Sequence, residues 1–150
     1  MYLPVKKEIF LKQSKNYLRK IIQCHSHNKK INHIVLDQSL NMWNFTEIFS
    51  YFDDVKIILV TRDPRSIFNS MKNRDAKAYP GYNLKIWTKW YEQIMYKFIN
   101  YMKKIPKKYK KYILEMKFED FCQNYESERN KVLNFLNTKK INDNFDIKNS

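Results

Sequence analysis

The run Lys56-Ile57-Ile58-Leu59-Val60-Thr61 constrains the fold of this chain more than any other segment. It is short, rich in β-branched residues and apolar at successive positions, which is typical of a parallel strand covered on both faces. Asp63 and Pro64 follow closely, and these residue types suit the N-cap and the first position of a helix. The segment therefore predicts a buried strand, a sharp turn and a helix that runs from Pro64 to Arg74.

The rest of the chain alternates between helical and strand-like patterns. Helical periodicity marks three further segments: 6–23, 83–104 and one around 132–136. Asn44 and Glu47 have the spacing of a capping box and predict another helix. The apolar runs at 33–36 and 112–118 predict two more strands. Because helices alternate with strands, we expect an α/β fold, a parallel sheet flanked by helices, in one domain over residues 1–150.

Composition limits the ways in which this chain could hold a phosphate. The sequence has one glycine, Gly81, so neither GxxxxGK[ST] nor GxGxxG exists in it. Its formal net charge of +14 favours an anionic partner such as a nucleotide, nucleic acid, an acidic polysaccharide or a membrane surface. The lysines are scattered, however, and an A/T-rich coding sequence would enrich lysine in the same way. The charge alone leaves both explanations open.

Cysteine content and hydropathy bear on location and metal binding. Cys24 and Cys122 are too few for a disulfide framework, which favours a reducing compartment and hence the cytoplasm. No apolar run reaches membrane-spanning length, and we expect no membrane segment and no signal peptide. His25 and His27 lie close to Cys24, but no second pair of ligands follows at suitable spacing. We therefore expect no metal site.

The junction between the strand and the helix has the features of an anion site. A helix N-terminus presents unpaired N–H groups and the positive end of its dipole. Arg62 lies at the carboxyl end of the strand, where ligands bind in open α/β sheets. Ser66 and Ser70 lie one turn apart on one helix face, so their hydroxyls can reach the same anion. The alternative is a capped helix whose arginines form surface ion pairs.

The segment from Lys56 to Ser70 resembles the 3′-phosphate-binding motif of sulfotransferases that use 3′-phosphoadenosine-5′-phosphosulfate (PAPS). That motif is a strand, Arg-Asp/Asn-Pro, and a serine eight residues after the arginine. The resemblance implies that Arg62 and Ser70 bind the 3′-phosphate of this co-substrate. The downstream run Ile113–Phe121 is similar to the strand and Tyr/Phe-Glu-Asp-Leu motif of the family. It implies that Phe118 contacts the adenosine, and we expect its ring to be buried there.

Two further points of comparison with the family concern catalysis. Ile34–Gln38 precedes the phosphate strand at the interval of the family's substrate-side strand, near which many members carry a catalytic base. The resemblance implies Asp37 as candidate base, with a strand-end cap as the alternative. The loops that bind the 5′-phosphosulfate in the family have no counterpart in this sequence. We therefore expect part of a P-loop-like sulfotransferase fold, over about residues 31–137, that is inactive alone.

The function implied by the resemblance is transfer of a sulfuryl group from PAPS to an acceptor hydroxyl or amine, with a saccharide among the candidate acceptors. No nucleic acid partner is expected. The alternative, from another class, is a non-catalytic basic module that binds nucleic acid or acidic polysaccharide through the lysines between 103 and 111. Trp87, Trp90 and Tyr91 have the spacing of a core helix face, although the same rings could stack on a sugar.

Overall fold

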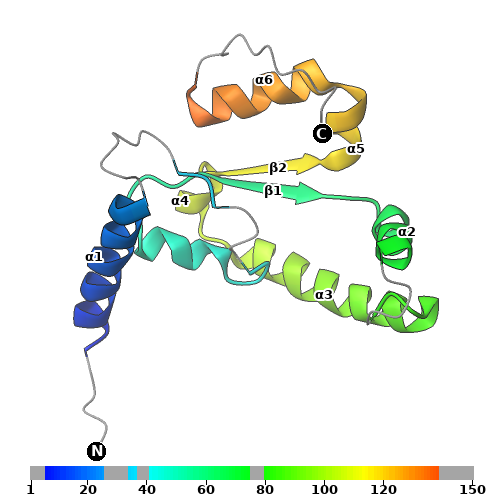
Figure 1. Cartoon of the computed structure of the whole chain (residues 1–150), viewed down its shortest axis with the longest axis horizontal. Helices are drawn as coiled ribbons and strands as arrows, with labels where there is room; N and C mark the ends of the chain where they lie inside the picture. Colours follow the sequence, from blue (N-terminus) through cyan, green and yellow to red (C-terminus); the bar gives the residue numbers. More distant parts are fainter. Residues whose placement is uncertain (1–5, 26–33, 37–40, 75–79, 139–150) are drawn as a thin grey trace, which may run out of the picture. The chain divides into compact units, whose positions relative to one another are not determined.

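The computed structural model describes residues 6–25, 34–36, 41–74 and 80–138. The chain divides into two compact units, Met1–Val55 with Ile94–Tyr109, and Lys56–Gln93 with Lys110–Ser150. The described elements are α1 (Lys7–His25), the 3-10 helix η1 (Phe45–Ser50), β1 (Ile57–Thr61), α2 (Pro64–Arg74), α3 (Leu84–Lys104), α4 (Lys107–Lys110), β2 (Ile113–Lys117), α5 (Phe118–Gln123) and α6 (Tyr125–Leu136). Figure 1 labels the α-helices and the strands.

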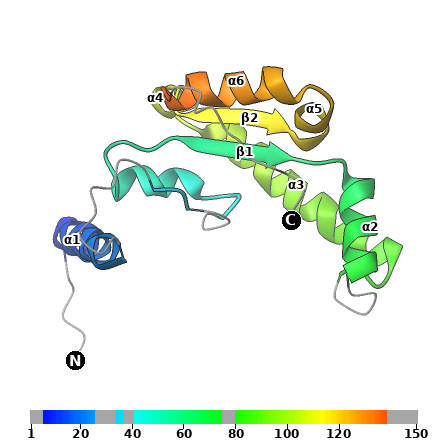
Figure 2. The ribbon, with the colours of Figure 1, turned by 45° about the horizontal axis from the view of Figure 1, so that its top comes forward.

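The second unit is built on a small parallel sheet. β1 pairs with β2 in a register that runs from Ile57 opposite Ile113 to Thr61 opposite Lys117. α5 continues directly from β2, and α6 then returns alongside the same strand, as Figures 1 and 2 both show. The segments predicted as strands at 56–61 and 112–118 are therefore confirmed as a parallel pair. Mixed helices and strands, with helices flanking a parallel sheet, are also confirmed.

Aromatic packing joins α2 to the beginning of α3 in this unit. The side chain of Trp87 is only 5% exposed, and its ring stacks on Tyr91 with centroids 5.0 Å apart. Phe68 of α2 lies against the same indole, at 5.3 Å between centroids. Trp87 is thus a core residue, as its helical spacing predicts. The packing fixes the direction in which α2 leaves the sheet.

The sheet is less covered than the sequence predicts. Ile57 is buried, but Val60, on the same strand, is 60% exposed. The flanking helices α5 and α6 pack on β2. The expectation that β1 is covered on both faces is therefore wrong at Val60, because apolar sequence alone does not supply the layer that would cover it.

The other unit has its own aromatic core. Phe45 of η1 is 1% exposed and lies edge-on against Tyr101, with ring centroids 5.1 Å apart. The Tyr101 hydroxyl accepts a hydrogen bond from the backbone N–H of Thr46 at 3.0 Å. The helix predicted after Asn44 is this short 3-10 helix, and the Asn44 side chain makes no capping hydrogen bond. The predicted capping box is therefore not formed.

The predicted strand at 33–36 is also not formed in its described part. Ile34, Val35 and Leu36 adopt no regular secondary structure, and Val35 is 89% exposed. A short strand is stable only when a neighbouring strand pairs with its backbone groups. The sheet of the described residues consists of β1 and β2, so this segment pairs with neither. His33 lies outside the described residues.

Candidate functional site

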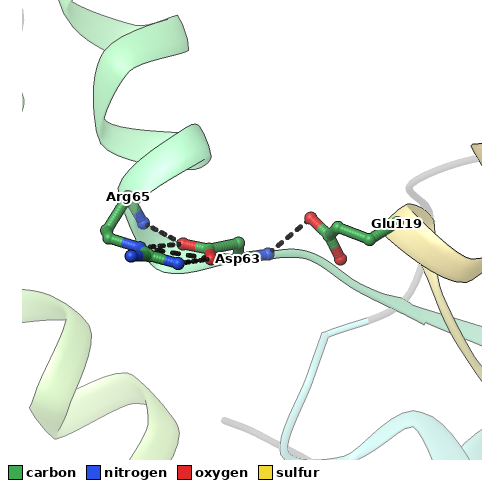
Figure 3. A network of polar contacts seen from close by, with 3 residues as sticks. All are labelled: Asp63, Arg65 and Glu119. Atoms are coloured by element: carbon green, nitrogen blue, oxygen red, sulfur yellow. Dashed lines mark hydrogen bonds and ion pairs between the residues drawn. The ribbon is translucent and has the colours of Figure 1, made fainter.

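The turn between β1 and α2 is held by polar contacts on both sides of Asp63 (Figure 3). One carboxylate oxygen of Asp63 accepts a hydrogen bond from the backbone N–H of Arg65 at 2.7 Å. The guanidinium of Arg65 donates to the same carboxylate, with its shortest contact at 2.6 Å. The backbone N–H of Asp63 in turn donates to the carboxylate of Glu119 at 2.9 Å. Asp63 is therefore the N-cap of α2, as predicted.

These contacts change the charges at the helix start. Hydrogen bonds from the Arg65 side chain and backbone lower the pKa of Asp63 from 3.8 to about 2. The same ion pair raises the pKa of the Arg65 guanidinium. Burial, together with the charge of Asp63, raises the pKa of the Tyr91 hydroxyl. Asp63 and Arg65 thus form a neutralised pair, which is the arrangement that the surface ion-pair interpretation predicts.

The helix N-terminus is not the anion donor that the sequence predicts. The N–H of Asp63 is used by Glu119, and the N–H of Arg65 is used by Asp63. Pro64, between them, has no N–H to offer. The Asp63 side chain therefore occupies the N–H of Arg65, the first N–H that α2 has, because an N-cap side chain competes with an external anion for the same groups. An anion at this turn depends on side chains instead.

Arg62 differs from Arg65 in that, within the described part of the chain, no ion pair compensates its charge. Its guanidinium lies over the ring of Phe118, with 4.8 Å between its carbon and the ring centroid. No carboxylate among residues 6–25, 34–36, 41–74 and 80–138 forms an ion pair with it. The residue is exposed to solvent. A cation held by a ring and left without a counter-ion is suited to bind an anion.

An open groove of about 600 Å³ lies along one face of α2, beginning at Arg62. Six polar residues line it: Arg62, Ser66, Asn69, Ser70, Asn73 and Arg74. The five that belong to α2 recur at helical spacing, so one face of the helix presents them together, and Arg62 precedes the helix. The described lining holds two arginines, hydroxyls and amides, and no carboxylate. The structure therefore brings Arg62 and Ser70, selected from the sequence, to the same groove.

Phe118 and Asp37 were also selected from the sequence, and the structure describes only the first of them. Phe118, the first residue of α5, is 40% exposed, so the expectation that its ring is buried is wrong. The ring lies at the end of the sheet, beside Arg62, where the cation covers it in place of a core. Asp37, the candidate base, lies outside the described residues.

Comparison with known proteins shows the family to which this chain belongs. A family model described as "Sulfotransferase family" matches residues 5–143. The chain belongs to the sulfotransferase family. The match includes both segments that carry the resemblance, the one before Ser70 and the one around Phe118. No curated protein and no solved structure matches this sulfotransferase-family chain.

Sequence reasoning missed several residues of this sulfotransferase-family site. Asn69, Asn73 and Arg74 line the groove, and their signal is the same helical periodicity that selected Ser66 and Ser70. The sequence predicts that Glu119 begins a helical turn, and its place in the first turn of α5 confirms this, but the contact of Glu119 with Asp63 is not predicted. The contact of Glu119 with Asp63 can be inferred only from the register of β1 and β2, because continuing that register beyond Thr61 and Lys117 places Glu119 opposite Asp63.

The described residues of this sulfotransferase-family chain contain neither a metal-binding cluster nor a helix that could span a membrane. Within residues 6–25, 34–36, 41–74 and 80–138, no three His, Cys, Asp or Glu side chains gather in a way that could hold a metal ion. Among the described helices, none combines the length and apolar character needed to cross a membrane.

Proposed function

We propose that this chain binds PAPS with its 3′-phosphate held by Arg62 and Ser70, as part of a site from which the sulfuryl group is transferred to a hydroxyl or amine of an acceptor once the loops that hold the 5′-phosphosulfate in the family are supplied. The observation that supports this most is that the two side chains line one groove. The groove residues fit a phosphate, because the described lining supplies cations and neutral donors without a carboxylate that would repel it. When bound, PAPS supplies the activated sulfuryl group.

The residues of the groove have separate roles in the proposal. Arg62 offers a planar guanidinium that can donate two parallel hydrogen bonds to phosphate oxygens. Ser70 donates a single hydroxyl hydrogen bond from the α2 face. Phe118 is placed near the nucleoside, because an exposed ring beside the phosphate arginine offers a surface for stacking.

The proposal extends to the fold and to catalysis. We place β1 and β2 in the P-loop-like parallel sheet of sulfotransferases, on the family match and the parallel pairing. Asp37 is proposed as the base that takes the proton of the acceptor, and this assignment depends on the sequence alone. An acceptor hydroxyl attacks sulfur more readily as its proton leaves.

The test compares two nucleotides that differ only in the 3′-phosphate. Adenosine 3′,5′-bisphosphate and AMP are titrated into residues 1–150, with binding followed by ³¹P NMR, which resolves the two phosphates and detects weak complexes. Arg62→Ala should weaken bisphosphate binding by about 1.5–3 kcal/mol, or about 10- to 150-fold, the range for hydrogen bonds to charged groups. Ser70→Ala should weaken it by about 0.5–1.5 kcal/mol. AMP binding should change little.

Lys72→Ala is the matched control, since Lys72 carries the same charge on α2 and is not among the groove residues. It should leave both affinities near those of the wild type. Equal affinity of wild type and Arg62→Ala for the bisphosphate would refute the assignment. A steep fall of affinity with salt, insensitive to Arg62, would instead support a basic module that binds polyanions through many lysines.

A further inference from the structure

The contacts between the two strands of the second unit continue beyond the sheet. The paired register ends with Thr61 opposite Lys117. The next residues on each side are Arg62 and Phe118, and the guanidinium lies 4.8 Å from the ring centroid. One position further, the N–H of Asp63 donates to the Glu119 carboxylate at 2.9 Å (Figure 3). Two successive residues before α2 are therefore held by two successive residues of α5.

The second of these contacts controls the backbone from which the Arg62 side chain leaves. The N–H of Asp63 belongs to the peptide unit that begins at the Cα of Arg62, and a peptide unit is planar. A hydrogen bond to this N–H therefore fixes the rotation of the plane next to Arg62. Glu119 is itself fixed in the first turn of α5, directly after β2. The Glu119 carboxylate thus restrains the backbone from which the arginine side chain extends.

The location of Glu119 needs an explanation, because a carboxylate near an anion site opposes anion binding. Within the described parts of the chain, Glu119 forms no ion pair that would account for it. Its carboxylate instead accepts a hydrogen bond from the backbone N–H of Asp63, in the turn between β1 and α2. At this place Glu119 acts as a hydrogen-bond acceptor for the Asp63 N–H, and this role does not require its negative charge.

We propose that Glu119 is a positioning residue for the 3′-phosphate of the donor: it orients Arg62 through the Asp63 N–H and so sets the preference of the site for a 3′-phosphorylated nucleotide. This inference rests on the proposed function, in which Arg62 binds that phosphate. It assigns Glu119 no contact with the ligand and no proton transfer. Its effect on binding comes entirely through Arg62.

The experiment measures the ratio of the affinities for adenosine 3′,5′-bisphosphate and AMP, again by ³¹P NMR on residues 1–150. Glu119→Ala removes the acceptor and should lower this ratio by about 3- to 10-fold, the size of one hydrogen bond in the binding equilibrium. Glu119→Gln keeps an acceptor oxygen and removes the negative charge, so its ratio should equal or exceed that of the wild type. Asp120→Ala removes the same charge one residue further on, from an exposed side chain, and should leave the ratio unchanged.

The ratio of the two affinities distinguishes a loss of Arg62 orientation from a loss of folded protein. Partial unfolding lowers the apparent affinity for both nucleotides equally and leaves their ratio unchanged. If Glu119→Ala does not fold, Glu119→Asp serves instead, since its shorter side chain withdraws the carboxylate from the Asp63 N–H. An unchanged ratio in Glu119→Ala or Glu119→Asp, with Arg62→Ala still lowering it, overturns this inference and leaves the proposed function standing. An unchanged ratio in Arg62→Ala overturns both. A low ratio in Glu119→Gln would show that the charge acts, and would also overturn the inference.

Discussion

Replacing Phe118 with alanine separates a surface role for this ring from a role in the core. In the structure the ring is 40% exposed and lies under the guanidinium of Arg62, at 4.8 Å. Trp87, in the same unit, is 5% exposed and packs between Phe68 and Tyr91. The two aromatic side chains therefore differ in burial while they belong to one compact unit.

The expected cost of Phe118→Ala follows from this exposure. Complete burial of a phenylalanine side chain contributes about 1.5–3 kcal/mol, and a ring that is about three fifths buried contributes about 1–2 kcal/mol. The contact with Arg62 adds about 0.5–1 kcal/mol at an exposed site. No closed cavity would remain, so the free energy of unfolding should fall by the sum of these two contributions, about 1.5–3 kcal/mol. Trp87→Ala leaves a cavity and should cost about 3–5 kcal/mol.

Urea unfolding followed by circular dichroism measures both variants against the wild type. Phe118→Leu is the control, because leucine keeps apolar bulk and removes the aromatic ring under Arg62. Its loss of stability should be smaller than that of Phe118→Ala. The reasoning is refuted if Phe118→Ala costs as much as Trp87→Ala, since the ring would then belong to the core.

Two further predictions concern carboxylates. The pKa of Asp63 is lowered from 3.8 to about 2 in the folded protein, so its ionised cap stabilises the fold above about pH 4 and this contribution is lost as the pH falls through about 2. NMR titration of the Asp63 carboxyl checks this, and a midpoint at the ordinary value, or the same acid dependence in Asp63→Asn, would contradict it. In a form of the protein that transfers the sulfuryl group, Asp37→Asn should lower kcat by about 10²- to 10⁴-fold with little change in bisphosphate affinity. A kcat equal to that of the wild type would remove Asp37 from the proposed site.

Local signals in the sequence predicted the elements around the site well. The turn after β1 contains a capping aspartate and a proline, and both act through the nearest few residues, so α2 begins at Pro64 as expected. Ser70 faces the groove because helical periodicity is a local property. These features need no knowledge of distant parts of the chain.

Features that depend on distant partners were predicted poorly. Ile34–Leu36 has the composition of a strand, but a strand also needs a neighbour, and composition does not identify one. The burial of Phe118 was inferred from its apolar character, whereas the partner that it meets is a cation from another segment. The contact of Glu119 with Asp63 was not predicted for the same reason, because the partner of Glu119 is a backbone N–H 56 residues earlier in the chain. Residue type does not reveal a contact with a backbone group.

The alignment of β1 with β2 has a consequence for how sequences of this family can diverge. Because the register sets which residues meet beyond Thr61, the long crossover between the strands can gain or lose residues without moving Arg62 relative to Phe118. A single deletion inside either strand would shift the alignment and separate them. Positions 62 and 118 meet through side chains, so related sequences should show correlated substitutions there. Position 119 meets a backbone N–H, so an acceptor should persist at 119 whichever residue occupies position 63.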